Sequence, residues 1–151
     1  MDRVIEWSAD SKEIAFVRFD QSSVKEYQFS LYKTSSPALE ANALYPSTYN
    51  YKYPKAGETN SKVSVQVFNI LDRTTKAMDL GKETDFYIPR IKWTTQPGQL
   101  GIIKLNRRQN QLDIIIANTA TTLCNTIFTQ RNDSYISEEA LDNFAFLPDA
   151  S

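Results

Sequence analysis

The residues of this chain that could perform nucleophilic or acid–base chemistry are few, and they form no catalytic set. The chain of 151 residues contains no histidine, which excludes, within the chain itself, Ser-His-Asp and Cys-His arrangements and histidine-based zinc sites. Its four glycines match neither the dinucleotide-binding pattern nor the phosphate-binding loop. We therefore assign the chain no catalytic residue, no metal site and no cofactor.

Two pairs of adjacent charged residues have simpler explanations than chemistry. Neighbouring side chains point in different directions, so Glu138 and Glu139 are interpreted as a solvated acidic pair within a short helical turn over residues 137–141. Arg107 and Arg108 could hold an anion, but they stand where a hairpin turn is expected. We interpret both pairs as solvated surface residues.

The single cysteine and the scattered aspartates also give no site. Asp79, Asp85 and Asp113 are spaced too loosely for a calcium-binding loop. Cys124 stands in an apolar run and has no histidine to lower its pKa, so we interpret it as a small buried hydrophobic residue.

The composition is typical of a globular β domain. Hydrophobic residues make up 41% of the chain and aromatic residues 12%, and the net charge is −1 with lysines and arginines dispersed. We therefore expect no nucleic-acid partner and no anionic membrane surface as a partner. No apolar run is long enough to cross a membrane, and the first residues show no signal-peptide pattern.

A strand-ending aromatic residue followed by a tight polar turn occurs three times, at Trp7, Trp93 and Phe146. After the first two, the chain enters a second apolar strand, at residues 13–17 and 99–103. The three aromatic residues stand 86 and 53 residues apart, and a hairpin repeated at such intervals is typical of the blades of a β-propeller. We expect Trp7 and Trp93 to be largely buried at equivalent positions of their blades.

The strand pattern predicts an all-β chain with about two four-stranded antiparallel blades of a propeller. We assign blade one to residues 1–81, blade two to residues 86–131 and the start of a third blade to residues 141–151. The predicted strands are residues 4–8, 13–20, 62–71, 75–80, 88–94, 100–106, 111–117 and 123–129.

A long arm, residues 21–61, interrupts blade one after its second strand. It holds six of the eight tyrosines of the chain and three prolines, and a segment of this length without a role is uncommon in a compact domain. Because exposed aromatic patches usually mark contact surfaces, we interpret it as a projecting, partly β-hairpin arm. A long ordered loop folded over its own blade remains the alternative.

Several segments resemble the propeller of the dipeptidyl peptidase IV family. The most specific is Tyr51–Val63, which contains the run Y-P-K-A-G followed by an asparagine and a strand. Together the matching segments extend over essentially the whole chain. They are residues 7–20, 23–32, 51–63, 105–113 and 141–149.

The resemblance implies a catalytic domain and a substrate-binding site that this chain does not contain. Members of the family are serine exopeptidases in which an eight-bladed propeller caps an α/β-hydrolase domain, and they release N-terminal dipeptides after Pro or Ala. Their Ser-Asp-His triad belongs to the hydrolase domain, and their substrate-binding Glu pair would lie upstream of Met1, so Glu138 and Glu139 do not inherit that role. The resemblance also implies a periplasmic, cell-envelope or secreted parent.

In well-known members of the family, an arm of this kind helps to form the dimer. The matching positions here are Tyr45, Pro46, Tyr53 and Pro54. We therefore interpret the chain as a non-catalytic propeller portion that walls a substrate chamber and carries a dimerisation arm. Its expected partners are a second copy of itself and, in the intact parent, peptide substrates. A stand-alone propeller module for protein interaction is the alternative.

Overall fold

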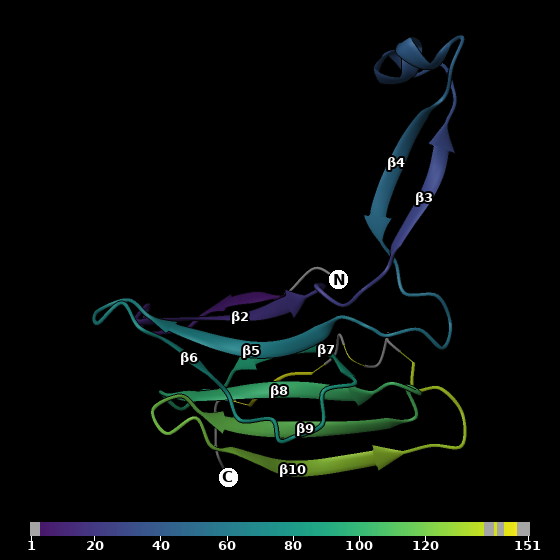
Figure 1. Ribbon diagram of the computed structural model, residues 1–151. Coiled ribbons are helices and arrows are strands. Elements are labelled where there is room, and N and C mark those ends of the chain that lie inside the picture. The colour runs from purple at the N-terminus through teal and green to yellow at the C-terminus, as the bar shows by residue number, and fades with distance from the viewer. Residues whose placement is uncertain (1–3, 138–140, 142–143, 148–151) are drawn as a thin grey trace. The chain divides into compact units, whose positions relative to one another are not determined.

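The strands of the computed structural model form three antiparallel sheets (Figure 1). The structure describes residues 4–137, 141 and 144–147. The chain divides into two compact units, one made of Met1–Phe19 with Lys62–Ser151 and the other of Asp20–Ser61. The second unit contains the arm.

The first sheet is formed by the strands on either side of the arm. Its order is β1-β2-β5-β6: short turns join β1 to β2 and β5 to β6, and the arm joins β2 to β5. Residues alternate across the strands, so that Ala15 and Val17 of β2 and Val65 and Val67 of β5 are buried on one face. The strands are β1 (Ile5–Trp7), β2 (Glu13–Asp20), β5 (Lys62–Asn69) and β6 (Thr75–Ala77).

The second sheet is a meander in which each strand pairs with its neighbour in the sequence, in the order β10-β9-β8-β7. Asn106 closes the central hairpin, because its side-chain Oδ1 accepts hydrogen bonds from the main-chain N–H groups of Asn110 and Gln111, both over 3.0 Å. The strands are β7 (Phe86–Trp93), β8 (Gln99–Asn106), β9 (Gln111–Asn118) and β10 (Cys124–Arg131).

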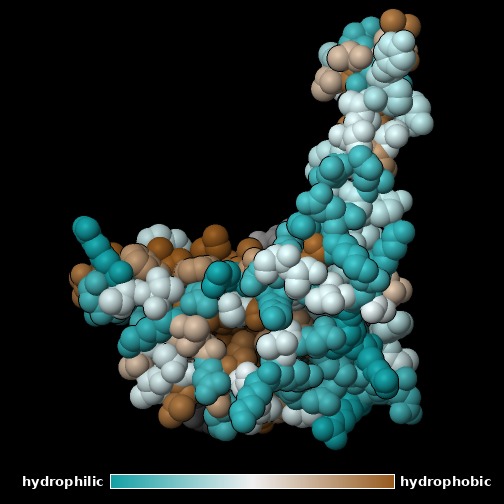
Figure 2. All heavy atoms as spheres, in the orientation of Figure 1, coloured by the Kyte–Doolittle hydropathy of each residue, from teal (hydrophilic) through white to brown (hydrophobic). Residues whose placement is uncertain are grey.

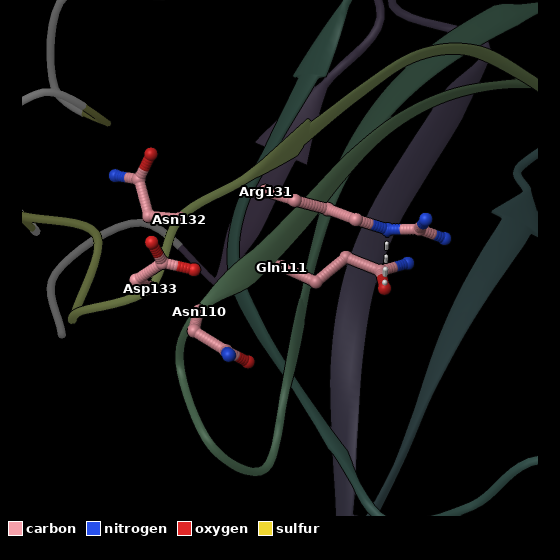
Figure 3. A pocket seen from close by; sticks show the side chains of 5 residues that line it. All are labelled: Asn110, Gln111, Arg131, Asn132 and Asp133. Atoms are coloured by element: carbon pink, nitrogen blue, oxygen red, sulfur yellow. Dashed lines mark hydrogen bonds between the residues drawn. The ribbon is translucent and has the colours of Figure 1, made fainter.

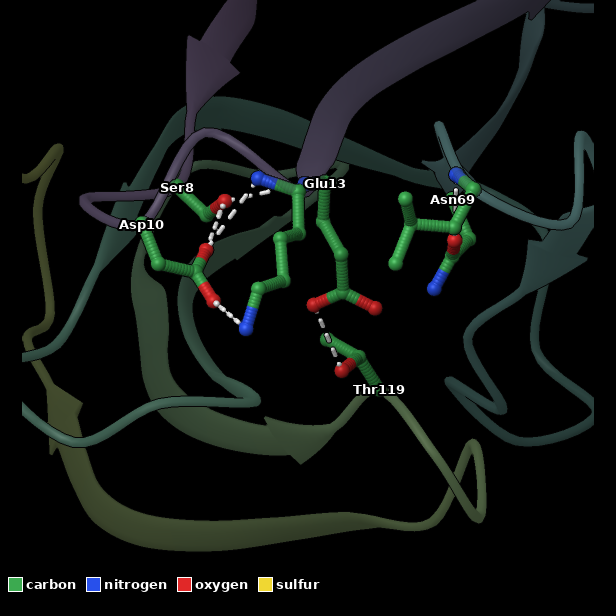
Figure 4. Close-up of polar contacts among 7 residues, drawn as sticks. Ser8, Asp10, Glu13, Asn69 and Thr119 are labelled. Atoms are coloured by element: carbon green, nitrogen blue, oxygen red, sulfur yellow. Dashed lines mark hydrogen bonds and ion pairs between the residues drawn. The ribbon is translucent and has the colours of Figure 1, made fainter.

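The two four-stranded sheets share one apolar core. Buried residues from β2 and β5 pack in the same cluster as buried residues from β7, β8 and β9, including Ile91, Leu100 and Ile102. Polar contacts also join the sheets. The Thr119 hydroxyl donates a 2.9 Å hydrogen bond to the Glu13 carboxylate, which lies beside the Ser8–Asp10 turn (Figure 4).

A second apolar cluster covers the other face of the β7–β10 sheet. Ile103, Leu105 and Leu112 of the sheet pack there with Ile136 and Leu141, which follow the last strand. The chain after β10 therefore folds back over its own sheet.

The predicted fold class is confirmed: the described chain is all-β, with two four-stranded antiparallel sheets and an arm between the second and third strands of the first. The eight predicted strands match observed strands with small shifts of their ends. The exact blade boundaries, including a third blade over residues 141–151, stay a prediction. Glu138, Glu139 and most of the expected helical turn over residues 137–141 lie outside the described residues.

The prediction that both tryptophans are largely buried is wrong for Trp7. Trp7 and Trp93 do occupy equivalent positions, because Trp7 pairs with Ile14 and Trp93 with Leu100. Trp93 is partly buried against the shared core, whereas Trp7 is 58% exposed. The reason is that the β1-β2-β5-β6 sheet covers Trp93, while no described element covers Trp7 to a similar extent.

Candidate interaction surface of the arm

The arm is a two-stranded antiparallel hairpin with an unbroken register. Strand β3 (Glu26–Leu31) pairs with β4 (Ser47–Lys52), and Tyr53 extends the pairing by donating its main-chain N–H to the Lys25 carbonyl over 3.1 Å. Because side chains alternate between the two faces of a strand, the aromatic residues at every second position of both strands gather on one face.

Five aromatic side chains form this face, and we call them the aromatic ladder. Tyr27 stands directly opposite Tyr51, and Phe29 stands directly opposite Tyr49. The Tyr51 ring contacts the rings of the other four members, with centroids 5.6–6.0 Å apart. Such edge-on and tilted contacts stabilise a hairpin by about 0.5–1.5 kcal/mol per pair. The aromatic ladder consists of Tyr27, Phe29, Tyr49, Tyr51 and Tyr53.

The aromatic ladder is open to solvent in the described chain. Tyr27, Phe29, Tyr49 and Tyr53 are between 37% and 51% exposed, and only Tyr51 is shielded further by its neighbours. The opposite face of the hairpin carries polar and charged side chains, with Glu26 opposite Lys52 and Gln28 opposite Asn50. A hairpin with one exposed aromatic face has the composition of a contact surface.

One end of the aromatic ladder, beside Tyr27 and Tyr53, carries charged residues. Lys55 Nζ lies 4.9 Å from the centroid of the Tyr27 ring, in a cation–π contact. Lys25 pairs with Glu58 over 2.7 Å. Exposed pairs of this kind contribute little to stability, so they define the rim of the surface more than they stabilise the hairpin.

The connection between β3 and β4 contains the 3₁₀ helix η1 (Pro37–Asn42), which the sequence did not predict. Pro37 stands at its start, where a proline costs no hydrogen bond. Lys33 Nζ donates to Glu40 Oε1 over 2.6 Å, which ties the helix back to the end of β3. The next residues, Leu44 and Tyr45, are the most exposed large apolar residues of the arm.

The four residues expected to form a dimer arm fall at two places. Tyr53 and Pro54 follow β4, and Tyr53 belongs to the aromatic ladder. Tyr45 and Pro46 precede β4, so the six residues of the strand, roughly 20 Å of extended chain, separate the two pairs.

The sequence analysis did not predict that Phe29 belongs to this surface. The signal was the alternation of aromatic residues at positions 27 and 29 on one strand and 49, 51 and 53 on the other.

A polar hollow of about 390 Å³ lies at the end of the second sheet, between β9 and β10 (Figure 3). Arg131 Nε donates a 3.2 Å hydrogen bond to Gln111 Oε1 across it. Its other lining residues are Asn110, Asn132 and Asp133. None of these lining residues is a serine, threonine, cysteine or lysine nucleophile, so we assign the hollow no catalytic role.

The one cysteine of the chain, Cys124, is free and partly buried. Burial, with a smaller contribution from Asp79, raises the pKa of the Cys124 thiol to about 11, so the thiol is protonated and unreactive at neutral pH. Within the part of the chain that the structure describes, no three acidic, cysteine or histidine side chains group as metal ligands. The same residues include no helix long and apolar enough to span a membrane.

A comparison with known protein families gives a match over the whole chain. The family model described as the dipeptidyl peptidase IV (DPP IV) N-terminal region matches residues 1–151. The chain belongs to this family. The two four-stranded sheets are accordingly part of a DPP IV-type propeller, and their open arrangement is that of a fragment of such a propeller.

Individual relatives of the DPP IV family agree with this assignment. The crystal structure of Porphyromonas gingivalis dipeptidyl peptidase 4 is 37% identical, with a TM-score of 0.80 over 92% of this chain and 19% of that one. A putative dipeptidyl aminopeptidase IV from Bacteroides ovatus is 26% identical, with a TM-score of 0.73 over 87% of this chain and 18% of that one. The inactive dipeptidyl peptidase 10 of Rattus norvegicus is 28% identical over 88% of this chain and 16% of its own length.

The chain thus spans less than a fifth of the length of these DPP IV relatives. Family membership fixes what kind of domain the sheets form. It does not assign a role to individual residues, so the parts given above to Tyr45, Pro46, Tyr53 and Pro54 stay predictions.

Proposed function

We propose that this chain is a non-catalytic propeller portion of a serine exopeptidase that releases N-terminal X-Pro or X-Ala dipeptides. The match of the DPP IV N-terminal region to residues 1–151 carries the proposal. The absence of histidine from the chain agrees with it, because a Ser-Asp-His triad would then have to lie elsewhere in a longer protein.

The physical task of the two sheets is to form a rigid wall. Ala15, Val65, Leu100, Ile102 and Ala117 are completely buried between them, and close packing of this kind resists deformation. A wall of packed sheets around a hydrolase site limits access to small or extended peptides. Peptide substrates are therefore partners of the intact protein and not of this chain alone.

The arm is proposed to mediate dimerisation. Its exposed aromatic ladder and the exposed Tyr45 give it two apolar contact areas, and tyrosines are enriched among the residues that dominate binding energy at interfaces. We also propose, from the family resemblance alone, that the longer protein works in the periplasm, at the cell envelope or outside the cell. Cell fractionation with an antibody against the chain tests this location.

A comparison of peptidase activity tests the main proposal. The longer protein that carries this chain is expected to cleave a Gly-Pro-linked chromogenic substrate, and the chain of 151 residues is expected not to. Replacing the serine of a G-x-S-x-G motif in the longer protein should abolish cleavage. Cleavage by the chain alone that survives repurification contradicts the non-catalytic role.

A second candidate is a propeller module that binds other proteins and has no peptidase activity. One observation favours it: the relatives include a protein named inactive dipeptidyl peptidase 10. The two candidates differ in the longer protein. A G-x-S-x-G motif followed by Asp and His, together with Gly-Pro cleavage, supports the peptidase, and their joint absence supports the binding module.

A further inference from the structure

The polar hollow between β9 and β10 is lined by groups of opposite charge. Its lining residues are Asn110, Gln111, Arg131, Asn132 and Asp133, and its volume is about 390 Å³. Small-ligand sites commonly measure about 300–1,000 Å³. Figure 2 shows hydrophilic side chains gathered over this end of the second sheet. The hollow therefore suits a small polar ligand.

Hydrogen bonds hold the two walls of the polar hollow together. The main-chain N–H of Asn132 donates to the Asn110 carbonyl over 2.9 Å, so the end of β10 is tied to the start of β9. The Asn110 side chain is also fixed, because Asn106 Nδ2 donates to Asn110 Oδ1 over 2.8 Å. A site whose walls are already in place loses less conformational entropy when a ligand binds.

Arg131 supplies the cationic side of the polar hollow. Its Nε donates to Gln111 Oε1 over 3.2 Å, and Gln111 Nε2 donates to Asp113 Oδ1 over 3.3 Å, so two successive hydrogen bonds orient the guanidinium group. Its two Nη atoms have no hydrogen-bond partner among residues 4–137, 141 and 144–147. An oriented guanidinium group can bind a carboxylate through two parallel hydrogen bonds.

Asp133 supplies the anionic side of the polar hollow. In Figure 3, Asp133 and Asn132 lie across the hollow from the paired Arg131 and Gln111 side chains. No ion pair joins Asp133 to Arg131, and the described part of the chain provides no hydrogen-bond donor to the Asp133 carboxylate. This carboxylate can therefore accept charge-assisted hydrogen bonds from an ammonium group of a ligand.

We infer that the polar hollow binds a free dipeptide in its zwitterionic form, with the ligand carboxylate on Arg131 and the ligand ammonium group on Asp133. The side-chain amides of Asn110, Gln111 and Asn132 complete the lining. Amide groups both donate and accept hydrogen bonds, so they can bind the peptide unit between the two charged ends of the ligand.

The separation of the two charges favours a dipeptide over a free amino acid. In an amino acid both charged groups are bonded to one carbon atom, whereas two residues of extended chain span roughly 7 Å. Arg131 and Asp133 lie on opposite sides of the hollow (Figure 3), which matches the longer ligand. A simple anion fits less well, because its charge would be repelled by the Asp133 carboxylate.

The choice of a dipeptide rests on the proposed function, in which dipeptides are the released products. The polar hollow is then a place where the released product binds to the propeller. The binding of a zwitterion by Arg131 and Asp133 rests on the lining of the hollow alone.

Isothermal titration calorimetry of the chain of 151 residues with Gly-Pro tests the inference. We expect Gly-Pro to bind about tenfold or more tightly than each of three probes, because each charge-assisted contact contributes to binding. The probes are acetyl-Gly-Pro, which lacks the ammonium group, Gly-Pro-amide, which lacks the carboxylate, and free proline. Equal binding of any probe, or no binding of Gly-Pro at about 10 mM, roughly ten times the Kd of a millimolar site, overturns the inference.

Two substitutions separate the two charged contacts. Arg131→Gln should remove the preference for Gly-Pro over Gly-Pro-amide and keep the preference over acetyl-Gly-Pro, and Asp133→Asn should do the reverse. Arg108→Gln is the matched control, because Arg108 is exposed and does not line the hollow; it should keep both preferences. A preference that survives the removal of its assigned charge overturns the inference.

These results are separable from the peptidase assay. Binding of Gly-Pro with all three preferences, beside a longer protein that cleaves nothing, supports the inference and contradicts the proposed function. Cleavage by the longer protein without binding of Gly-Pro by the chain does the opposite. If the chain of 151 residues does not fold by itself, a photoactivatable Gly-Pro analogue on the longer protein decides. Labelling of the tryptic peptide that begins at Asn132 is expected, and its absence overturns the inference.

Discussion

The Phe146 ring occupies the space that a side chain at Gly101 would need. A Cβ atom there would also lie 3.1 Å from the Lys92 carbonyl oxygen. Glycine weakens the middle of a strand, but the missing side chain of Gly101 in β8 leaves the space in which the Phe146 ring lies.

Gly101→Ala is expected to lower the free energy of unfolding by about 1–3 kcal/mol, since it overpacks a filled site. Thermal or urea unfolding measures the effect. In a Phe146→Ala background the ring is gone, and Gly101→Ala should then cost clearly less, because only the 3.1 Å approach to the Lys92 carbonyl oxygen remains. The same destabilisation in both backgrounds would mean that Phe146 is not the cause.

Trp93→Phe is expected to destabilise the chain by about 1 kcal/mol, because the Glu6 carbonyl loses its indole donor. Trp7→Phe is the matched control, since Trp7 is exposed in this chain and should tolerate the change. Urea unfolding of both variants gives the comparison. Equal losses would contradict a specific role for the Trp93 hydrogen bond.

Tyr51→Ala is expected to loosen the arm selectively. The substitution removes four ring contacts at once, each contributing about 0.5–1.5 kcal/mol. Hydrogen exchange at the main-chain amides of β3 and β4 should accelerate by at least tenfold, while amides of β8 keep their protection. Tyr32→Ala, at an exposed position just after β3, is the control and should change neither.

Tyr45→Ala and Tyr53→Ala test the proposed dimerisation. If the two tyrosines are buried anchors in the dimer, each substitution should weaken association by more than about 1 kcal/mol. Sedimentation equilibrium of the wild-type protein, the single variants and the double variant measures this. A monomeric wild type, or a double variant that associates as strongly as the wild type, would show that the arm is not the dimer contact.

The Ser8–Asp10 turn predicts a pH effect. The Ser8 hydroxyl donates a 2.7 Å hydrogen bond to the Asp10 carboxylate, which lowers the pKa of Asp10, with a smaller contribution from the Lys12 main chain. A lowered pKa means that Asp10 stabilises the fold above its unfolded-state pKa, roughly 3.9, and that this contribution is lost as the pH falls through the folded pKa.

Carboxyl NMR titration should therefore show Asp10 titrating below the usual aspartate range, and Ser8→Ala should move its pKa upward. Asp72 is an internal control, because the Thr74 hydroxyl lowers its pKa independently of Ser8. An unchanged Asp10 titration in Ser8→Ala would contradict the assigned cause.

The alternation of apolar residues and the repeated hairpin determined much of the fold from sequence. Eight strands, their grouping in fours and the equivalence of Trp7 and Trp93 follow from local periodicity and turn residues, which are properties of neighbouring positions. The residue types of the arm likewise predicted an aromatic contact segment, although the two-residue alternation that includes Phe29 went unused.

Burial was decided only by the tertiary structure. Trp7 and Trp93 have the same strand position and the same kind of cross-strand partner, yet one is exposed and the other is packed in the core. The difference arises because burial depends on which sheet lies against a face, and that contact joins residues as distant as Glu6 and Trp93. For the same reason, the need for glycine at position 101 becomes visible only once Phe146 is seen to lie over it.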